Sequence, residues 1–356
     1  MAEDTRPVRP AEQLPWPRVE AWLRERLPAC GIPGLDARAP MEVEQFPGGH
    51  SNLTYQLRFG AIELVLRRPP FGPVPPTAHD MTREFRWLSA VHPAFPLAPR
   101  AYLLCDDTTV LGSAFYVMER RRGLVVRTEE PPQIRDRPEV RRRVSSAMIQ
   151  ALADLHRLDV SAEGLAHLGK PEGFVARQVR GWTERWTRAQ TEAVPGMEAL
   201  AAWLAARVPP APARFGIVHG DFKLDNVMLD AGEPSRLVAV FDWEMAALGD
   251  PLVDLGILLA YWTPTTPPGM RDALTTVTTR PGWFTRDEIV ERYAAASGRD
   301  VSALRYFEVF ALFKIAVVIQ QIYYRYVNGQ TDDPRFARFG ERVRFLASEA
   351  QRLAGA

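Results

Sequence analysis

The stretch GIVHGDFKLDNVML, residues 216–229, constrains the fold of this chain more than any other part of its sequence. Apolar, strand-like runs stand at both of its ends. The loop between them carries five polar side chains: His219, Asp221, Lys223, Asp225 and Asn226. Chemistry-bearing residues are typically held on loops that a rigid scaffold positions. We therefore predict a functional site in this loop.

The spacing of three oxygen-bearing side chains indicates what that site does. Four residues separate Asp221 from Asn226, and Asp242 stands at the end of the next predicted strand, 236–242. In phosphoryl transfer one carboxylate accepts the proton of the attacking hydroxyl, while an amide oxygen and a second carboxylate hold Mg²⁺ at the nucleotide phosphates. Asp and Asn are also common in ordinary turns, but the preceding His-Gly and the apolar flanks of Asp242 favour catalysis.

The chain upstream of this loop has the pattern of a small sheet. Residues 52–59 alternate apolar and polar side chains, Gly60 and Ala61 make a turn, and 62–68 runs back, which predicts a β-hairpin. Helical spacing follows in residues 77–91. Two more strand-like runs complete the segment, at 101–105 and 113–120. We predict an antiparallel sheet with one helix inserted after its third strand.

Helical patterns dominate after about residue 121, for example over 138–158 and 249–262. The fold class that we predict is therefore α+β, with a small antiparallel-sheet lobe and a larger, mainly helical lobe. The expected domains are an N-terminal helical extension over 1–35, a small lobe over 36–120 and a large lobe over 121–356.

The composition of the chain indicates which kinds of molecule it is not built to bind. The 356 residues carry a net charge of +1, so no global excess of charge points to nucleic acid or to an anionic membrane. Cys30 and Cys105 are far apart and form no CxxC motif, which is typical of a reducing compartment. The N-terminus has no apolar signal region. The most apolar run, 306–327, is interrupted by charged residues, so we expect it to form a buried helix. Taken together, these features predict a cytoplasmic protein without a membrane or nucleic-acid partner.

Several motifs in order resemble one known family. HGDFKLDN (219–226) and VFDWEMAALGDPLVDLG (240–256) are similar to the catalytic and metal-binding motifs of the aminoglycoside phosphotransferase and choline kinase-like family. The upstream segments FPGGHSNLTYQL, LVLRRPP, REFRWL and FYVMER agree. The chain resembles in particular the kinase-like domains attached to some acyl-CoA dehydrogenases. The resemblance implies a bilobal protein kinase-like fold that binds ATP or GTP with Mg²⁺.

The resemblance also assigns roles to single residues. It makes Asp221 the catalytic base and implies that Asn226 and Asp242 bind Mg²⁺. Lys223 could touch the γ-phosphate or be an ordinary surface lysine. The nucleotide side is implied at nine positions: Gly48, Gly49, Ser51 and Asn52 over the phosphates, Arg67 with Glu84, and Met118, Glu119 and Arg120 at the adenine.

One position departs from the family pattern. The third strand of the small lobe usually carries a lysine, and here LVLRR offers Arg67 and Arg68. Neighbouring strand residues point to opposite faces, and the alternation with Leu64 and Leu66 selects Arg67 for the site. Arginine keeps the charge but presents a planar fork of donors instead of a point charge.

The function that we predict is a Mg²⁺-dependent small-molecule kinase. The alternative is a catalytically weak or silent nucleotide-binding scaffold of the same fold, which the arginine at position 67 favours slightly. A metal-dependent hydrolase built on His219 and Asp221 is a weaker reading. We expect the phosphate acceptor to be a hydroxyl on a neutral or largely apolar molecule, because the segment from Leu255 onwards is not acidic.

Overall fold

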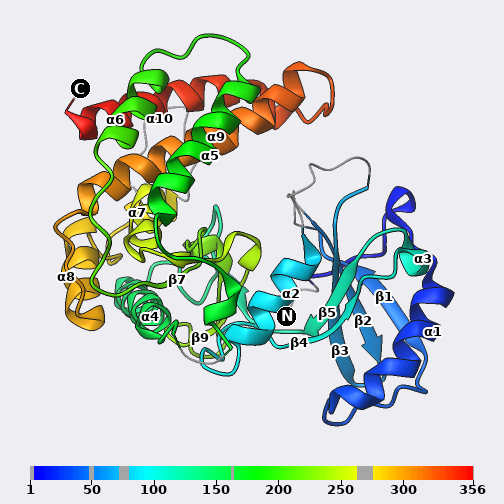
Figure 1. The fold of residues 1–356 in the computed structure, drawn as a ribbon. Helices are drawn as coiled ribbons and strands as arrows, with labels where there is room; N and C mark the ends of the chain where they lie inside the picture. Colours follow the sequence, from blue (N-terminus) through cyan, green and yellow to red (C-terminus); the bar gives the residue numbers. More distant parts are fainter. Residues whose placement is uncertain (1–3, 48–51, 72–79, 162–163, 263–275, 356) are drawn as a thin grey trace. The chain divides into compact units, whose positions relative to one another are not determined.

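A computed structural model describes residues 4–47, 52–71, 80–161, 164–262 and 276–355. The chain forms two compact units (Figure 1). Unit 1 consists of Met1–Arg122 and Ala239–Glu244, and unit 2 of Gly123–Val238 and Met245–Ala356. A short piece of the later sequence therefore belongs to the N-terminal unit. The domain boundaries expected at residues 35 and 120 stay predictions.

Unit 1 contains the predicted antiparallel sheet, whose strand order is β1-β2-β3-β5-β4. The strands are β1 (Met41–Gln45), β2 (Leu53–Phe59), β3 (Ile62–Arg68), β4 (Ala101–Cys105) and β5 (Phe115–Glu119). The predicted hairpin of β2 and β3 is confirmed. Helix α2 (Met81–Val91) follows β3 and begins later than expected, because the Asp80 side chain caps it by accepting the Arg83 N–H. Residues 77–79 lie outside the described part of the chain.

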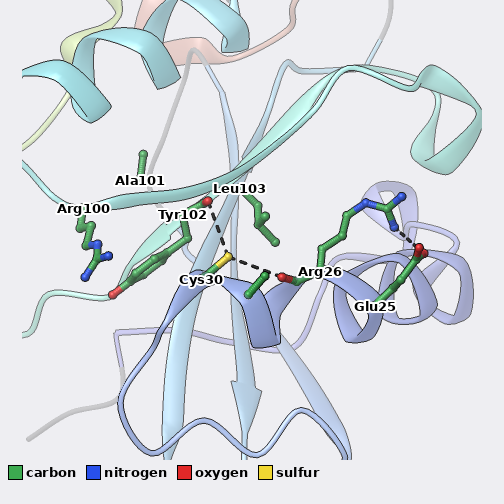
Figure 2. A pocket seen from close by; sticks show the side chains of 8 residues that line it. Glu25, Arg26, Cys30, Arg100, Ala101, Tyr102 and Leu103 are labelled. Atoms are coloured by element: carbon green, nitrogen blue, oxygen red, sulfur yellow. Dashed lines mark hydrogen bonds and ion pairs between the residues drawn. The ribbon is translucent and has the colours of Figure 1, made fainter. Parts of the chain in front are cut away.

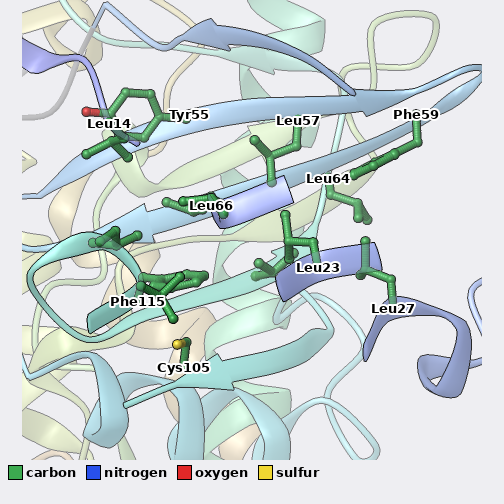
Figure 3. Packing of buried hydrophobic residues seen from close by; sticks show 14 residues of the cluster. Leu14, Leu23, Leu27, Tyr55, Leu57, Phe59, Leu64, Leu66, Cys105 and Phe115 are labelled. Carbon is green, nitrogen blue, oxygen red and sulfur yellow. The ribbon is translucent and has the colours of Figure 1, made fainter. Parts of the chain in front are cut away.

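The core of unit 1 lies between the sheet and the N-terminal helix α1 (Trp16–Arg26) (Figure 3). Leu23 of α1 is fully buried against strand residues that include Leu57 and Phe115. Full burial of such a side chain stabilises a fold by about 1.5–3 kcal/mol. The segment that we expected as an extension thus shares its core with the sheet. The short helix α3 (Thr108–Leu111) joins the same cluster through Val110 and Leu111.

Unit 2 is mainly helical, as predicted. Its helices are α4 (Pro138–Arg157), α5 (Phe174–Ala189), α6 (Met197–Ala206), α7 (Leu252–Tyr261), α8 (Arg286–Ser297), α9 (Leu304–Val327) and α10 (Phe339–Ala354). Its short strands form two small sheets: β7 (Gly216–Val218) pairs with β10 (Ala247–Gly249), and β8 (Val227–Leu229) lies between β6 (Leu124–Val125) and β9 (Leu237–Val240). The last residues of β9 belong to unit 1.

Helix α9 is the central helix of unit 2 and packs against α5, α7 and α10 (Figure 1). By length and composition it could cross a membrane, but 61% of its most apolar window is buried inside the structure, and core helices of soluble proteins pass the same test. Most of its side chains from Leu304 to Gln320 are buried. The expectation of a buried helix over 306–327 is therefore confirmed for most of this segment.

Candidate functional site

The predicted polar loop leaves β7 at Val218 and enters β8 at Val227, all within unit 2. A 3₁₀ turn, Leu224–Asn226, brings its two ends close together. Lys223 Nζ donates to both oxygens of the Asp221 carboxylate, at 3.1 and 2.8 Å. Asn226 Nδ2 donates to the Asp221 carbonyl and to Oδ2, each at 2.8 Å. The structure thus brings Asp221, Lys223 and Asn226 together.

Lys223 balances the charge of Asp221. Burial opposes its ammonium charge, but the side chains of Tyr261 and Asp221 outweigh this and raise the pKa of Lys223. The ammonium lies 4.8 Å from the centroid of the Tyr261 ring, a cation–π contact. Burial raises the pKa of the Tyr261 hydroxyl to about 12. Lys223 is therefore charged and held beside the carboxylate, while the Asp221 side chain stays 21% exposed.

Asp254 on α7 fixes the backbone of the loop. Its two carboxylate oxygens accept the N–H groups of His219, at 2.6 Å, and Gly220, at 2.7 Å. His156 Nε2 lies 3.2 Å from Asp254 Oδ2, and its Nδ1 lies 2.7 Å from the Tyr293 hydroxyl. Burial opposes the charge of Asp254, but His156 outweighs it and lowers the pKa of this carboxyl. Asp254 therefore anchors the loop backbone.

The residues before Asp221 are also constrained. His219 Nδ1 accepts the Asp221 N–H at 3.2 Å, so His219 binds the loop backbone. Gly220 has φ of +84°, and a Cβ at this position would lie 2.8 Å from the Met245 carbonyl oxygen. Only glycine fits this conformation and this close approach without strain. The glycine between His219 and Asp221 is therefore a steric requirement of the loop.

A second cluster lies in unit 1 around the guanidinium of Arg67. Nη1 donates to Glu84 Oε1 on α2 at 2.6 Å, and Nη2 donates to Asp242 Oδ1 at 2.8 Å. Burial opposes the charge of Arg67, but Glu84, with Tyr116 and Asp242, raises its pKa well above the ordinary value. Burial in turn raises the pKa of Glu84, and Arg67 limits this effect. The predicted pairing of Glu84 with the β3 base is confirmed, as is the inward orientation of Arg67.

Arg68 occupies the other side of β3. Its Nε donates to the Pro69 carbonyl at 2.9 Å, and its guanidinium lies 4.2 Å from the Phe71 ring centroid. The side chains of the two neighbouring arginines therefore contact different residues on opposite sides of β3, as strand alternation predicts.

Asp242 does not stand in a strand, contrary to our expectation that the strand runs to 242. Strand β9 ends at Val240, and Asp242 adopts φ of +68°, a left-handed conformation rare outside glycine. Such a conformation costs about 1–3 kcal/mol and persists where surrounding contacts enforce it. The ion pair with Arg67 is one such contact. Two residues later, Glu244 Oε2 accepts a hydrogen bond from Asn52 Nδ2 at 3.1 Å.

The other predicted nucleotide positions lie in unit 1 or outside the described residues. Met118 and Glu119 end β5, where Glu119 accepts the Arg100 N–H at 3.0 Å. The Arg120 guanidinium turns toward the Phe46 ring, 4.8 Å away, and pairs with Asp4. Gly48, Gly49 and Ser51 lie outside the described part of the chain.

Sequence reasoning missed three participants: Glu244, His156 and Tyr261. Glu244 stands inside the quoted VFDWE motif, so its place two residues after Asp242 was a usable signal. His156 lies in a helix with no motif around it, and Tyr261 stands five residues after the quoted motif ends. Only tertiary contacts with Asp254 and Lys223 reveal these two residues.

A separate hollow of about 530 Å³ lies at the edge strand β4 of unit 1 (Figure 2). Cys30, Arg100 and Tyr102 line it, with Cys30 Sγ 3.7 Å from the Tyr102 carbonyl and the Arg100 guanidinium 5.2 Å from the Tyr102 ring. None of the predicted site residues that the structure describes lines this hollow.

The chain as a whole is similar to several known proteins. Mouse acyl-CoA dehydrogenase family member 10 is 33% identical over 349 residues, which are 98% of this chain and 32% of that protein. The chain thus spans about a third of the length of this relative. A solved structure from Ralstonia eutropha JMP134, described as a candidate aminoglycoside phosphotransferase, is 30% identical, with a TM-score of 0.80 over 96% of this chain and 99% of that one.

Two more distant structures share the fold. A thermostable mutant of aminoglycoside phosphotransferase APH(4)-Ia, in ternary complex with AMP-PNP and hygromycin B, has a TM-score of 0.58 at 17% identity, over 89% of this chain and 95% of that one. Ethanolamine kinase from Plasmodium vivax has a TM-score of 0.62 at 10% identity, over 95% and 89%. The predicted bilobal, kinase-like α+β fold class is therefore confirmed.

The family assignment rests on the sequence itself. The Phosphotransferase enzyme family matches residues 42–289, which include both clusters described above. The predicted enzyme class, a phosphotransferase, is confirmed at the level of the family. The chain belongs to the phosphotransferase enzyme family.

Proposed function

We propose that this protein transfers the γ-phosphate of ATP or GTP, with Mg²⁺, to a hydroxyl group of a neutral or largely apolar small molecule. The proposal rests on the exposure and the hydrogen-bond partners of the Asp221 carboxylate. Its carboxylate is partly exposed, is paired with Lys223 and Asn226, and stands on a loop whose backbone Asp254 holds. A carboxylate fixed in this way can accept the proton of an attacking hydroxyl.

Asn226 and Asp242 fit the requirements of Mg²⁺, which prefers oxygen ligands. The Nδ2 of Asn226 is turned toward Asp221, which leaves its amide oxygen as the atom for a cation. Asp242 supplies a carboxylate in unit 1, held by Arg67. The bound ion would neutralise charge on the phosphates.

Unit 1 supplies the proposed nucleotide site. Arg67 offers a charged fork of donors, and Glu84 fixes its direction. Asn52 is buried and tied to Glu244, which holds the start of β2 beside the segment of Asp242. The AMP-PNP bound by the distant aminoglycoside phosphotransferase supports a nucleotide in this fold. The Met118–Arg120 segment is the proposed contact to the base.

The proposed acceptor is a neutral or largely apolar molecule and not a polycation such as an aminoglycoside. Charged amines leaving water need carboxylate partners, yet the segment from Leu255 to the C-terminus contains ten Asp and Glu against thirteen Lys and Arg. The central helix α9 is largely apolar and buried. Apolar walls with a few polar groups suit a mostly apolar ligand.

The decisive experiment is a mass-spectrometric screen. The protein is incubated with Mg²⁺, ATP or GTP, and a library of hydroxylated metabolites that includes kanamycin-type aminoglycosides. We expect a product heavier by one phosphoryl group. It should form far more slowly with Asp221→Asn and at an undiminished rate with Asp225→Asn, a matched change in the same loop. If no acceptor yields a product, the proposed kinase activity is refuted and the alternative, a catalytically silent nucleotide-binding scaffold, is favoured. Aminoglycoside turnover with kcat/KM of about 10⁴ M⁻¹s⁻¹ or more, an ordinary enzyme value, would refute the acceptor class.

A further inference from the structure

Lys314 is a buried lysine in the otherwise apolar middle of α9. The residue is 6% exposed, and its Nζ donates a hydrogen bond to the Gly220 carbonyl. The ammonium also lies 5.4 Å from the centroid of the Trp182 ring on α5. No carboxylate among the described residues lies within ion-pair distance of it, so a backbone carbonyl is its principal partner.

The Gly220 carbonyl lies directly before Asp221 in the chain, so its contact with Lys314 affects the proposed catalytic base. The Gly220 carbonyl and the Asp221 N–H belong to one planar peptide group. Lys314 binds this group at its oxygen, and His219 Nδ1 binds it at its N–H. The plane directly before Asp221 is therefore clamped at both ends. Its orientation sets the direction in which the Asp221 side chain leaves the backbone.

Packing alone does not account for a lysine at this position. Burial lowers the pKa of Lys314 to about 8, because the charged form loses its hydration. Four charged groups face it from three elements: Asp221 and Lys223 on the loop, Asp254 on α7 and Arg185 on α5. The two carboxylates favour its charge and the two cations oppose it. An apolar side chain of similar volume would fill the same space without this penalty.

We propose that Lys314 is a positioning residue for phosphoryl transfer, which holds the Gly220–Asp221 peptide so that the Asp221 carboxylate meets the acceptor hydroxyl. This role rests on the proposed function, since it assumes that Asp221 is the base. Lys314 acts through the peptide group and needs no contact with substrate. A small rotation of that peptide displaces the carboxylate, and a displacement of about 1 Å can cost about 10²-fold in rate.

The test compares two buried polar side chains of the same helix. Lys314→Met removes the donor atom and keeps an unbranched side chain that is one atom shorter. Gln320→Met is the matched control, because Gln320 is 1% exposed and donates to the Ala189 carbonyl at 2.8 Å, away from the catalytic loop. A third variant, Lys314→Gln, retains a neutral donor. Each is assayed for kcat and KM and for hydrogen exchange at the Asp221 amide.

We expect Lys314→Met to lower kcat by about 10- to 100-fold with little change in KM, and to speed exchange at the Asp221 amide. Lys314→Gln should fall between it and the wild type. Gln320→Met should change neither kcat nor this exchange. Wild-type kcat in Lys314→Met, or an equal loss in Gln320→Met, would overturn the proposal. If the wild type phosphorylates no acceptor, the proposed function fails, and amide exchange alone decides: equal exchange in both methionine variants overturns the positioning role.

Discussion

The guanidinium of Arg67 holds two carboxylates at once, and a lysine has one ammonium to offer. In Arg67→Lys we expect the pair with Glu84 to survive, because this carboxylate is the more deeply buried, with a side chain 1% exposed against 29% for Asp242. A hydrogen bond to a charged group contributes about 1.5–3 kcal/mol. Water recovers part of this at the partly exposed Asp242, so we expect the free energy of unfolding to fall by about 1–2 kcal/mol.

Arg67→Ala should be more damaging, because it leaves Glu84 buried without its partner. Breaking a buried ion pair from one side costs about 3–5 kcal/mol. The order of stability is then wild type, Arg67→Lys, Arg67→Ala. Urea unfolding followed by tryptophan fluorescence measures each value, with Arg68→Ala as the control for loss of charge from the same strand. The affinity for MgATP should follow the same order.

The pH dependence makes this test sharper. Burial raises the pKa of Glu84 above its unfolded value, and loss of Arg67 raises it further. A carboxyl with a raised folded pKa binds its proton more tightly in the folded state, so its neutral form stabilises the fold at low pH and this benefit is lost as pH rises. The stability gap between Arg67→Ala and the wild type should therefore narrow from pH 8 to pH 5. A constant gap, or equal destabilisation by lysine and alanine, would refute the two-carboxylate account.

Four further outcomes are expected. Asp221→Asn should lower kcat by about 10²–10⁴-fold and leave MgATP affinity, measured by thermal shift, nearly unchanged; wild-type turnover would contradict the base assignment. Asp254→Asn should lower the unfolding free energy by about 3–5 kcal/mol in urea titrations, and a neutral effect would contradict its anchoring role. Gly220→Ala should destabilise by about 1–3 kcal/mol in the same titrations, since its Cβ meets Met245; unchanged stability would contradict the steric requirement. Lys314 has a folded pKa of about 8, below its unfolded value of about 10.4. The unfolded state therefore binds more protons in this window, so wild-type stability should rise relative to Lys314→Met between these pH values, and a flat difference would show that the lysine is not desolvated.

The sequence predicted those features whose signal is local. The alternation of β2 and β3 placed Arg67 on the inner face, helical spacing placed Glu84 in a helix, and the family resemblance implied that the two pair. The polar loop was visible because apolar strands flank it on both sides. Each of these patterns depends on residues that are neighbours along the chain.

Contacts between distant residues could not be predicted in the same way. Arg67 meets Asp242 across 175 positions, and Lys314 meets Gly220 across 94. No periodicity encodes either contact, because both arise from how separate elements pack. The left-handed backbone of Asp242 is a further example: its sequence continues an apolar run, while its conformation is enforced in part by Arg67, a residue from another strand.

The segment Ala239–Glu244 has a consequence for how the protein is made. It completes unit 1, where Trp243 packs on Phe95 and Asp242 binds Arg67, yet it is synthesised long after Arg122. At about 5–20 residues per second, the ribosome needs on the order of ten seconds to supply it. During that interval the nascent N-terminal unit carries Arg67 and Glu84 without their third partner. Unit 1 can therefore complete its folding only after residues 123–238 of unit 2 have been translated. The six residues Ala239–Glu244 thus link the folding of one unit to the synthesis of the other.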